Sequence, residues 1–131
     1  IVNGKKTNLK IKNNKKISES ILNTTSPYLF ANKSEQSSFE RLSKRVRLTR
    51  LGGDCYSYCL LADGHVDIVV ESGLNPWDIR ALEPIIVNAG GVIKTWDDKK
   101  IFNGGRIIAC ANSKNFNQCR SILNKKNPPK N

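Results

Sequence analysis

The sequence predicts an α/β fold in which helices pack on the faces of a sheet. From residue 47 onward, short β-branched runs alternate with segments whose apolar residues recur every three or four positions, the spacing of a helix. Residues 66–71, Val-Asp-Ile-Val-Val-Glu, form a nearly continuous β-branched run, as expected for a buried central strand. Hydrophobic residues make up 38% of the 131 residues, which is enough for one core.

The first third of the chain is expected to contain one helix between short strands. Residues 8–11 alternate weakly like an edge strand, and a further strand is predicted at 21–22. Residues 24–27, Thr-Thr-Ser-Pro, are typical of a loop that caps a helix. Phe39, Leu42 and Val46 predict a helix over 37–46 because their spacings are three and four. A strand over 47–51 then ends at Gly52 and Gly53.

The next helix is predicted over residues 54–63, with Asp54 at its N-cap and Gly64 ending it. It is apolar on most faces, so we expect it to be buried. After the strand at 66–71 and a loop at 72–75, Pro76 fits the first position of a helix running to about residue 88. The inward residues of that helix are expected to be Ile79, Leu82, Ile85, Ile86 and Ala89.

The last part of the chain predicts two strands and a helix. The strands are expected at 92–96 and 106–111, with a turn at 97–99 between them. Asn112 or Ser113 is expected to cap a helix to about residue 123. Residues 125–131 are expected to form a flexible basic tail. There is no internal repeat and no internal domain boundary.

The net charge of +11 is unevenly distributed along the chain. Residues 1–50 carry twelve basic and three acidic side chains, and residues 99–131 carry eight basic and none acidic. Residues 51–98 carry two basic and eight acidic side chains, so the middle is acidic. A basic chain suggests nucleic acid, but no aromatic stacking residue lies in the basic run at 3–16. Nucleic acid is therefore not the expected partner, and a basic nucleic-acid-binding module is kept as an alternative.

The location expected from the sequence is cytoplasmic. No apolar stretch approaches the roughly 20 residues of a membrane helix, so no membrane partner is expected. The four cysteines at 55, 59, 110 and 119 are expected to be reduced, buried thiols, because nothing marks secretion. The sequence contains no Met and begins at Ile1, which favours a cleaved or incomplete chain.

Three carboxylates of the acidic middle are predicted at the ends of elements. Asp54 begins a helix, Glu71 ends the central strand, and Asp78 lies in the first turn of the following helix. Ligands of open α/β sheets bind beyond the carboxyl ends of the strands. A carboxylate cluster there can hold a divalent cation or a cationic substrate group. The backbone N–H groups of Gly52 and Gly53 suit a phosphate or hydroxyl oxygen.

Each of these carboxylates also has a purely structural interpretation. Asp54 is equally explained as an N-cap, Asp78 as a partner of the helix dipole, and Glu71 as a solvated strand end. Asp63, Asp67 and the only histidine, His65, are expected at the surface.

Two stretches resemble a known family. Residues 77–91, Trp-Asp-Ile-Arg-Ala-Leu-Glu-Pro-Ile-Ile-Val-Asn-Ala-Gly-Gly, resemble the C-terminal signature of the inositol monophosphatase family. Residues 50–71, which begin Arg-Leu-Gly-Gly-Asp-Cys-Tyr, resemble its histidinol-phosphate phosphatase branch, because typical inositol phosphatases tend to have Gly-Ser/Thr-Ala-Ala there. Residues 24–27 are similar to the same branch.

The resemblance implies the second half of a layered α-β-α-β-α sandwich, formed by residues 1–124 as the C-terminal portion of a sugar-phosphatase-like domain. It implies Mg²⁺-assisted hydrolysis of a small phosphate monoester by an enzyme that is often dimeric. By resemblance, Asp78 would be a ligand of the second Mg²⁺, and Glu71 would contact the non-phosphate part of the substrate. Gly52, Gly53 and Asp54 would line the substrate pocket.

The chain also departs from the family pattern. The family's first metal-binding Glu and its Asp-Pro-Ile-Asp-Gly-Thr motif belong to an N-terminal half and do not occur here. We therefore expect no catalytic residue within this chain, and no activity unless the missing half is supplied. The leading hypothesis is the C-terminal half of a histidinol-phosphate phosphatase of histidine biosynthesis, because Asp54 and Glu71 can pair with a cationic substrate. The alternative is an inositol-1-phosphate or related phosphatase of the same family.

Overall fold

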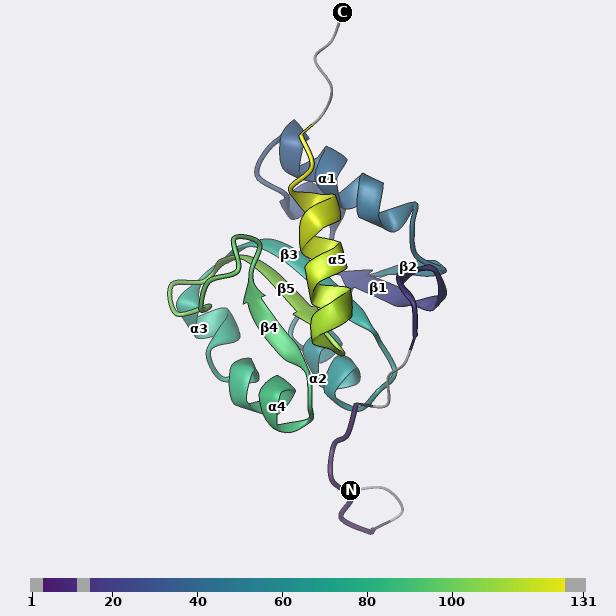
Figure 1. Ribbon diagram of the computed structural model, residues 1–131. Coiled ribbons are helices and arrows are strands. Elements are labelled where there is room, and N and C mark those ends of the chain that lie inside the picture. Colours follow the sequence, from purple (N-terminus) through teal and green to yellow (C-terminus); the bar gives the residue numbers. More distant parts are fainter. Residues whose placement is uncertain (1–3, 12–14, 127–131) are drawn as a thin grey trace, which may run out of the picture.

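Five strands form one mixed sheet in the order β2-β1-β3-β5-β4 (Figure 1). The computed structural model describes residues 4–11 and 15–126. Within these, β1 is parallel to β2 and β3, whereas β5 is antiparallel to β3 and β4. The strand that the sequence predicts to be central, β3, lies in the middle. The strand bounds are Ile21–Thr24 (β1), Leu48–Leu51 (β2), Ile68–Leu74 (β3), Val92–Thr95 (β4) and Gly105–Cys110 (β5).

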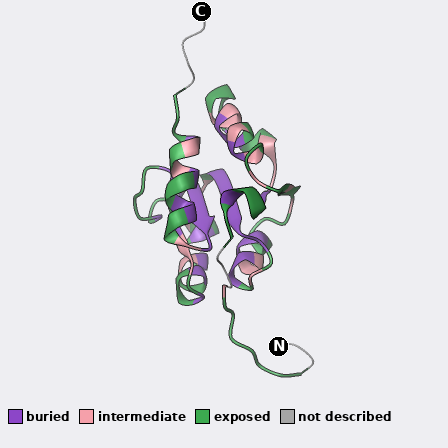
Figure 2. Cartoon of the chain, turned by 45° about the vertical axis from the view of Figure 1, so that its right-hand side comes forward, coloured by how far each residue is buried: buried purple, intermediate pink, exposed green. Residues whose placement is uncertain are grey.

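Helices cover both faces of the sheet, which confirms the α/β prediction. Val69 packs in one core cluster with residues of α2 and α4, and Val70 packs in the other with residues of α1 and α5. Consecutive strand residues point to opposite faces, so β3 contributes to both cores. Figure 2 shows the buried strands between helices with exposed outer sides. The helix bounds are Lys33–Ser43 (α1), Tyr56–Ala62 (α2), Pro76–Ile79 (α3), Leu82–Asn88 (α4) and Ser113–Leu123 (α5), with 3₁₀ turns at Ile17–Glu19 (η1) and Pro27–Leu29 (η2).

Side-chain caps fix where the two longest helices begin. The Asn112 side chain accepts a hydrogen bond from Asn115 N at 2.8 Å, so α5 starts as predicted. The Asn32 side chain accepts from Glu35 N at 2.9 Å, and α1 therefore begins at residue 33 rather than 37. Ser26 caps η2 in the loop that the sequence predicts to be a cap.

The prediction of one long helix over 76–88 is wrong, because this segment forms two helices, α3 and α4. Pro84 lacks an N–H, and its ring would clash with the carbonyl of residue 80 in a continuous helix. The break therefore falls at residues 80–81, and Pro84 lies in the first turn of α4. Ile85 is 36% exposed rather than inward, whereas the other four predicted inward residues are buried. The weak strand predicted over 8–11 does not form, and Ile11 N donates to Ala89 O instead.

Asp67 corrects a second expectation, since it is buried rather than at the surface. Its carboxylate accepts hydrogen bonds from Ile21 N at 2.8 Å and Lys15 Nζ at 3.4 Å. It thereby fixes the start of β1 beside β3. His65 is exposed as predicted and lies 3.1 Å from Asp63, which is also exposed.

All four cysteines are free, as predicted. Their expected burial holds for Cys110 and Cys119, whereas Cys59 is half-buried and Cys55 is exposed. Within the described part of the chain, no helix is long and apolar enough to cross a membrane. Most of the predicted tail, residues 127–131, lies outside the described residues.

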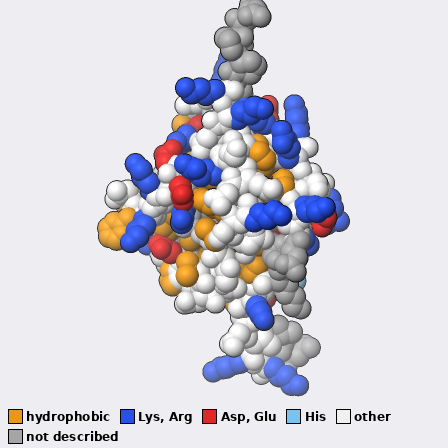
Figure 3. Space-filling view, in the orientation of Figure 1, with side chains coloured by type: hydrophobic (Ala, Val, Ile, Leu, Met, Phe, Trp, Pro, Cys, Tyr) orange, Lys and Arg blue, Asp and Glu red, His pale blue; other side chains and the backbone are white. Residues whose placement is uncertain are grey.

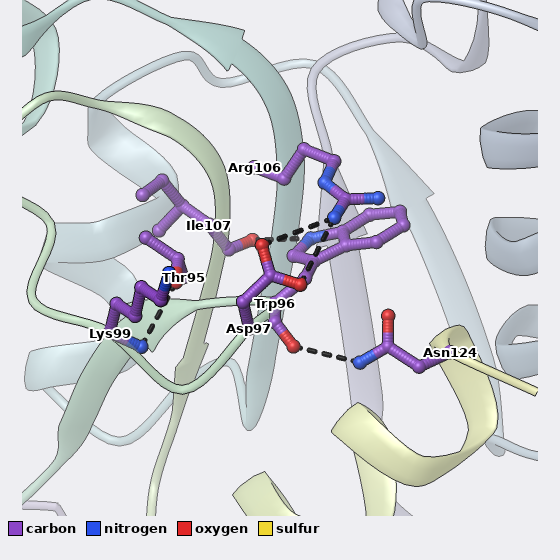
Figure 4. Close-up of polar contacts among 7 residues, drawn as sticks. All are labelled: Thr95, Trp96, Asp97, Lys99, Arg106, Ile107 and Asn124. Carbon is purple, nitrogen blue, oxygen red and sulfur yellow. Dashed lines mark hydrogen bonds and ion pairs between the residues drawn. The ribbon is translucent and has the colours of Figure 1, made fainter.

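A polar cluster ties the β4–β5 hairpin to the end of α5 (Figure 4). Trp96 Nε1 donates to Ile107 O at 3.3 Å, and Asn124 Nδ2 donates to Trp96 O at 2.8 Å. Arg106 pairs with Asp97 at 3.3 Å and stacks its guanidinium over the Trp96 ring.

On the face that carries α5, Lys and Arg side chains are spread widely (Figure 3).

Candidate active site

The three carboxylates singled out from the sequence line one cavity of about 320 Å³. They come from the turn before α2, from β3 and from α3. The volume is at the lower end of the range of about 300–1,000 Å³ that small-molecule sites occupy. The lining residues are Thr25, Leu29, Asp54, Cys55, Tyr58, Glu71, Leu74 and Asp78.

A larger hollow of about 590 Å³ lies beside the start of α5. Lys15, Lys16 and Lys114 contribute to its wall, together with uncharged side chains. No carboxylate is among its lining residues, so this hollow offers no anionic oxygen ligand for a divalent cation or a cationic substrate group. The cavity with the three carboxylates is the candidate active site.

Asp54 reaches the cavity because the chain turns sharply after β2. Gly52, Gly53 and Asp54 have φ values of 90°, 101° and 44°, all in the left-handed region. Asp54 is not the N-cap of α2, which corrects that interpretation; the helix begins two residues later, and Cys55 is the N-cap. The Asp54 carboxylate is therefore not used as a helix cap.

The two glycines do not line the cavity wall. Gly52 N donates to the carbonyls of Thr24 and Thr25, so this N–H is already used within the protein. A Cβ on Gly53 would lie 2.7 Å from Ser57 Oγ. The structural role of the glycines is to form the turn that carries Asp54, and their contact with a substrate stays a prediction.

Glu71 lies inside β3 rather than at its end, because the strand continues through an irregular register to Leu74. Its side chain is 6% exposed, and its Oε2 accepts a hydrogen bond from Thr25 Oγ1 at 3.2 Å. Burial is the largest cause that raises the pKa of Glu71 to about 7. The negative charges of Asp54 and Asp78 raise this pKa further, whereas the hydrogen bond from Thr25 and the nearby hydroxyl of Tyr58 oppose the rise.

Asp78 makes a structural capping contact and also lines the cavity. In the first turn of α3, its Oδ2 accepts a hydrogen bond from Asn75 N at 2.9 Å, which is a structural capping contact. The residue is also exposed at the cavity, and its second carboxylate oxygen has no hydrogen bond to the described residues. That oxygen is a hard ligand of the kind that Mg²⁺ prefers.

The described residues do not form a complete metal site. Among them, no group of three or more His, Cys, Asp and Glu side chains is arranged to hold a metal ion. Asp78 is thus suited to be one ligand of a site that needs further ligands.

Tyr58 and Thr25 are cavity residues that sequence reasoning missed. Tyr58 was attributed only to a buried apolar helix, and Thr25 only to a loop. The resemblance of residues 24–27 and 50–71 to one family branch was the available signal, because both stretches contribute side chains to this cavity. Leu29 and Leu74 add apolar surface to its wall.

Comparison with known proteins finds one family that matches almost the whole chain. The sequence profile of the inositol monophosphatase family matches residues 1–126. The Arabidopsis thaliana protein named "Bifunctional phosphatase IMPL2, chloroplastic" is 44% identical over 100 residues, which are 76% of this chain and 29% of that protein. A histidinol-phosphatase from Mycobacterium tuberculosis is 38% identical over 71 residues, 54% of this chain and 27% of that protein.

The fold is also similar to solved structures. An inositol monophosphatase from Zymomonas mobilis superimposes with a TM-score of 0.84 and 36% sequence identity, over 88% of this chain and 46% of that one. The chain therefore spans less than half the length of the relatives it matches.

Proposed function

Because the chain belongs to the inositol monophosphatase family, we propose that it is the C-terminal half of a Mg²⁺-dependent phosphatase that hydrolyses histidinol phosphate. Membership of the family and the relatives that are named phosphatases support a hydrolase. The activity, the substrate, the metal and the assembly of the two halves are all parts of this proposal. Homodimers in the cytoplasm are the proposed form and location of the complete enzyme.

One observation carries the choice of substrate: Asp54 and Glu71 line the same small cavity. Histidinol phosphate carries an ammonium and an imidazole, and two carboxylates can pair with these groups. Inositol offers only hydroxyl groups. The relatives named histidinol-phosphatase support the same choice.

The residues of this chain would bind and orient the substrate. Asp54 and Glu71 would hold its cationic end, and Asp78 would contribute one oxygen ligand to Mg²⁺. When bound, Mg²⁺ supplies Lewis-acid activation of the phosphate and of the attacking water. The apolar side chains of Leu29 and Leu74 would exclude water beside the charged groups, which strengthens their attraction to the substrate.

Inositol 1-phosphate is the second candidate substrate. The raised pKa of Glu71, about 7, favours it, because a partly protonated carboxyl can donate to and accept from hydroxyl groups. The structural similarity to an inositol monophosphatase is equally compatible with it.

The test measures phosphate release by a full-length enzyme that contains this chain. We expect kcat/KM for histidinol phosphate to exceed that for inositol 1-phosphate by about tenfold or more, a ratio that about 1.4 kcal/mol of differential binding produces. Asp54→Asn should reduce this ratio. The exposed Asp63→Asn is the matched control and should leave it unchanged.

Asp78→Asn should nearly abolish turnover of both substrates, because it removes a charged metal ligand. Retained activity would remove Asp78 from the metal site. Equal or reversed rates for the two substrates in the unmutated enzyme would contradict the histidinol phosphate assignment and leave the phosphatase activity intact.

A further inference from the structure

Tyr58 places a buried polar group in the wall of the candidate active site. Its side chain is 2% exposed and lines the cavity. The hydroxyl oxygen is buried and has no hydrogen-bond partner among the described residues. Buried hydroxyl groups in folded proteins nearly always have a partner, so this one calls for a functional or structural explanation.

The Glu71 carboxylate is the charged group that most affects this hydroxyl. Burial is the main cause that raises the pKa of Tyr58 well above its ordinary value, followed by the charge of Glu71 and the contact of the hydroxyl with that carboxylate, ahead of the charge of Asp78. Both side chains line the same cavity, although the Tyr58 hydroxyl is not in hydrogen-bonding geometry with any described group.

Glu71 has unused capacity to accept hydrogen bonds. A carboxylate offers about four acceptor positions. Among the described residues, Thr25 Oγ1 is the donor that bonds to it, at 3.2 Å. The phenol of Tyr58 is thus a donor without an acceptor, and the Glu71 carboxylate has acceptor positions that Thr25 does not use.

Three elements bring this group together. Tyr58 comes from α2, Glu71 from β3, and Thr25 from the loop between β1 and η2. Tyr56 lies on the same helix, but it is 62% exposed and does not line the cavity. Residues two apart on a helix face different directions, so Tyr56 provides a matched control on the same element.

We propose that Tyr58 is a positioning residue that donates a hydrogen bond to the ionised Glu71 carboxylate and, together with Thr25, holds it toward the cavity for pairing with a cationic substrate group. The identity of that substrate rests on the proposed function, whereas the hydrogen bond does not. Tyr58 acts through Glu71, because its own hydroxyl is too deeply buried to reach a ligand in the cavity.

The hydrogen bond is tested first in this chain without ligand. At pH 9, where Glu71 is ionised, the ¹³C resonance of its side-chain carboxyl should move in Tyr58→Phe and stay unchanged in Tyr56→Phe. In the unmutated chain, a nuclear Overhauser contact should join the Tyr58 hydroxyl proton to the Glu71 side chain, which tests the same bond without any substitution. An unchanged resonance in a folded Tyr58→Phe, or no such contact in the unmutated chain, overturns the proposal.

The functional consequence is tested in a full-length enzyme that contains this chain. Tyr58→Phe should raise KM for histidinol phosphate about tenfold, as expected for losing a hydrogen bond to a charged group, and should change kcat much less. The same substitution should have no further effect in a Glu71→Gln background. Additive effects in the double variant would contradict an action through Glu71, and a merely structural role would lower kcat for every substrate alike.

The two proposals fail separately. An unmutated enzyme that prefers inositol 1-phosphate contradicts the proposed substrate, while the ¹³C measurement still decides the role of Tyr58. Conversely, a clear preference for histidinol phosphate with an unchanged Glu71 resonance overturns the positioning role alone.

Discussion

The aspartates at positions 63 and 67 lie four residues apart and have opposite environments. The Asp63 side chain is 52% exposed and lies beside His65, whereas the Asp67 side chain is 3% exposed. Asp67 accepts the hydrogen bond from Ile21 N that begins β1. Sequence analysis assigned both residues to the surface by their charge, although Asp63 ends the helix predicted over 54–63 and Asp67 lies within the strand predicted over 66–71.

Asp67→Ala should lower the free energy of unfolding by about 2–4 kcal/mol, because it leaves the N–H of Ile21 without its acceptor. Asp63→Ala should change the same quantity by less than about 0.5 kcal/mol, as is usual at exposed sites. Urea denaturation at neutral pH measures both. Similar losses in the two variants would show that the Asp67 contact contributes little.

Glu71 should make the stability of the protein depend on pH. Its pKa in the folded protein is about 7, above the ordinary value of 4.5, so the folded state binds this proton more tightly than the unfolded state does. The resulting stabilisation is complete below about pH 4.5 and is lost as the pH rises through 7. Glu71→Gln should therefore gain about 1–3 kcal/mol relative to the unmutated protein between pH 4.5 and pH 8, after allowance for partial solvent screening.

Unfolding experiments at several pH values across this window measure the difference. The exposed Glu40→Gln is the control and should show no such pH-dependent gain. A difference between Glu71→Gln and the unmutated protein that does not vary with pH would contradict the raised pKa.

At the scale of elements, the strands and most helices follow from the sequence because their signals are local. The β-branched run of β3 and the Asn112 cap of α5 each determine their element without distant partners. The break between α3 and α4 also has a local cause in Pro84, which the apolar periodicity concealed. By contrast, the continuation of β3 past Glu71 depends on its pairing with β5, which no local pattern contains.

The candidate site was predictable to a similar extent. The clustering of Asp54, Glu71 and Asp78 followed from their places near element ends. The left-handed backbone of Asp54 and the approach of Tyr58 to Glu71 depend on how α2 packs against β3, which is a tertiary property. Sequence reasoning therefore identified the acidic residues and missed the neutral ones.

Gly104 lies close to the backbone at the end of β3. A Cβ at this position would lie 2.2 Å from Leu74 O, at the end of β3. Gly105 also has a positive φ, but a Cβ there would meet nothing within 4 Å. Alanine substitutions at the two glycines therefore distinguish the cost of backbone strain, which both share, from the cost of a steric clash, which arises only at Gly104.

Gly105→Ala should cost about 1–2 kcal/mol of unfolding free energy, the strain of a left-handed Cβ. Gly104→Ala should cost clearly more, because the backbone at Leu74 and Asn75 must also move. Thermal and urea unfolding of the two variants provide the comparison. Equal costs would mean that the β3 end adjusts freely.

At the scale of the whole molecule, the incomplete metal site makes a prediction about this chain alone. A ligand raises stability only if it binds the folded state more tightly than the unfolded state. Because no group of three or more His, Cys, Asp and Glu side chains among the described residues is arranged to hold a metal ion, Mg²⁺ should bind weakly. Its addition to about ten millimolar should therefore shift Tm by less than about 2 °C, because the population of bound protein stays small.

Differential scanning calorimetry with and without a chelator checks this prediction. The same titration in a full-length enzyme should give a larger shift. A large shift in this chain would show that its own residues complete the metal site.

The order of the sheet has a consequence for how this protein behaves in concentrated solution. β2 is an edge strand, and its Leu48 and Leu51 are 48% and 61% exposed. An edge with apolar side chains is a template on which strands of other molecules can assemble. Arg50 within the strand and Arg47 immediately before it oppose such assembly, and the net charge of +11 adds general repulsion between molecules. Arg47 and Arg50 thus disfavour aggregation through this edge strand.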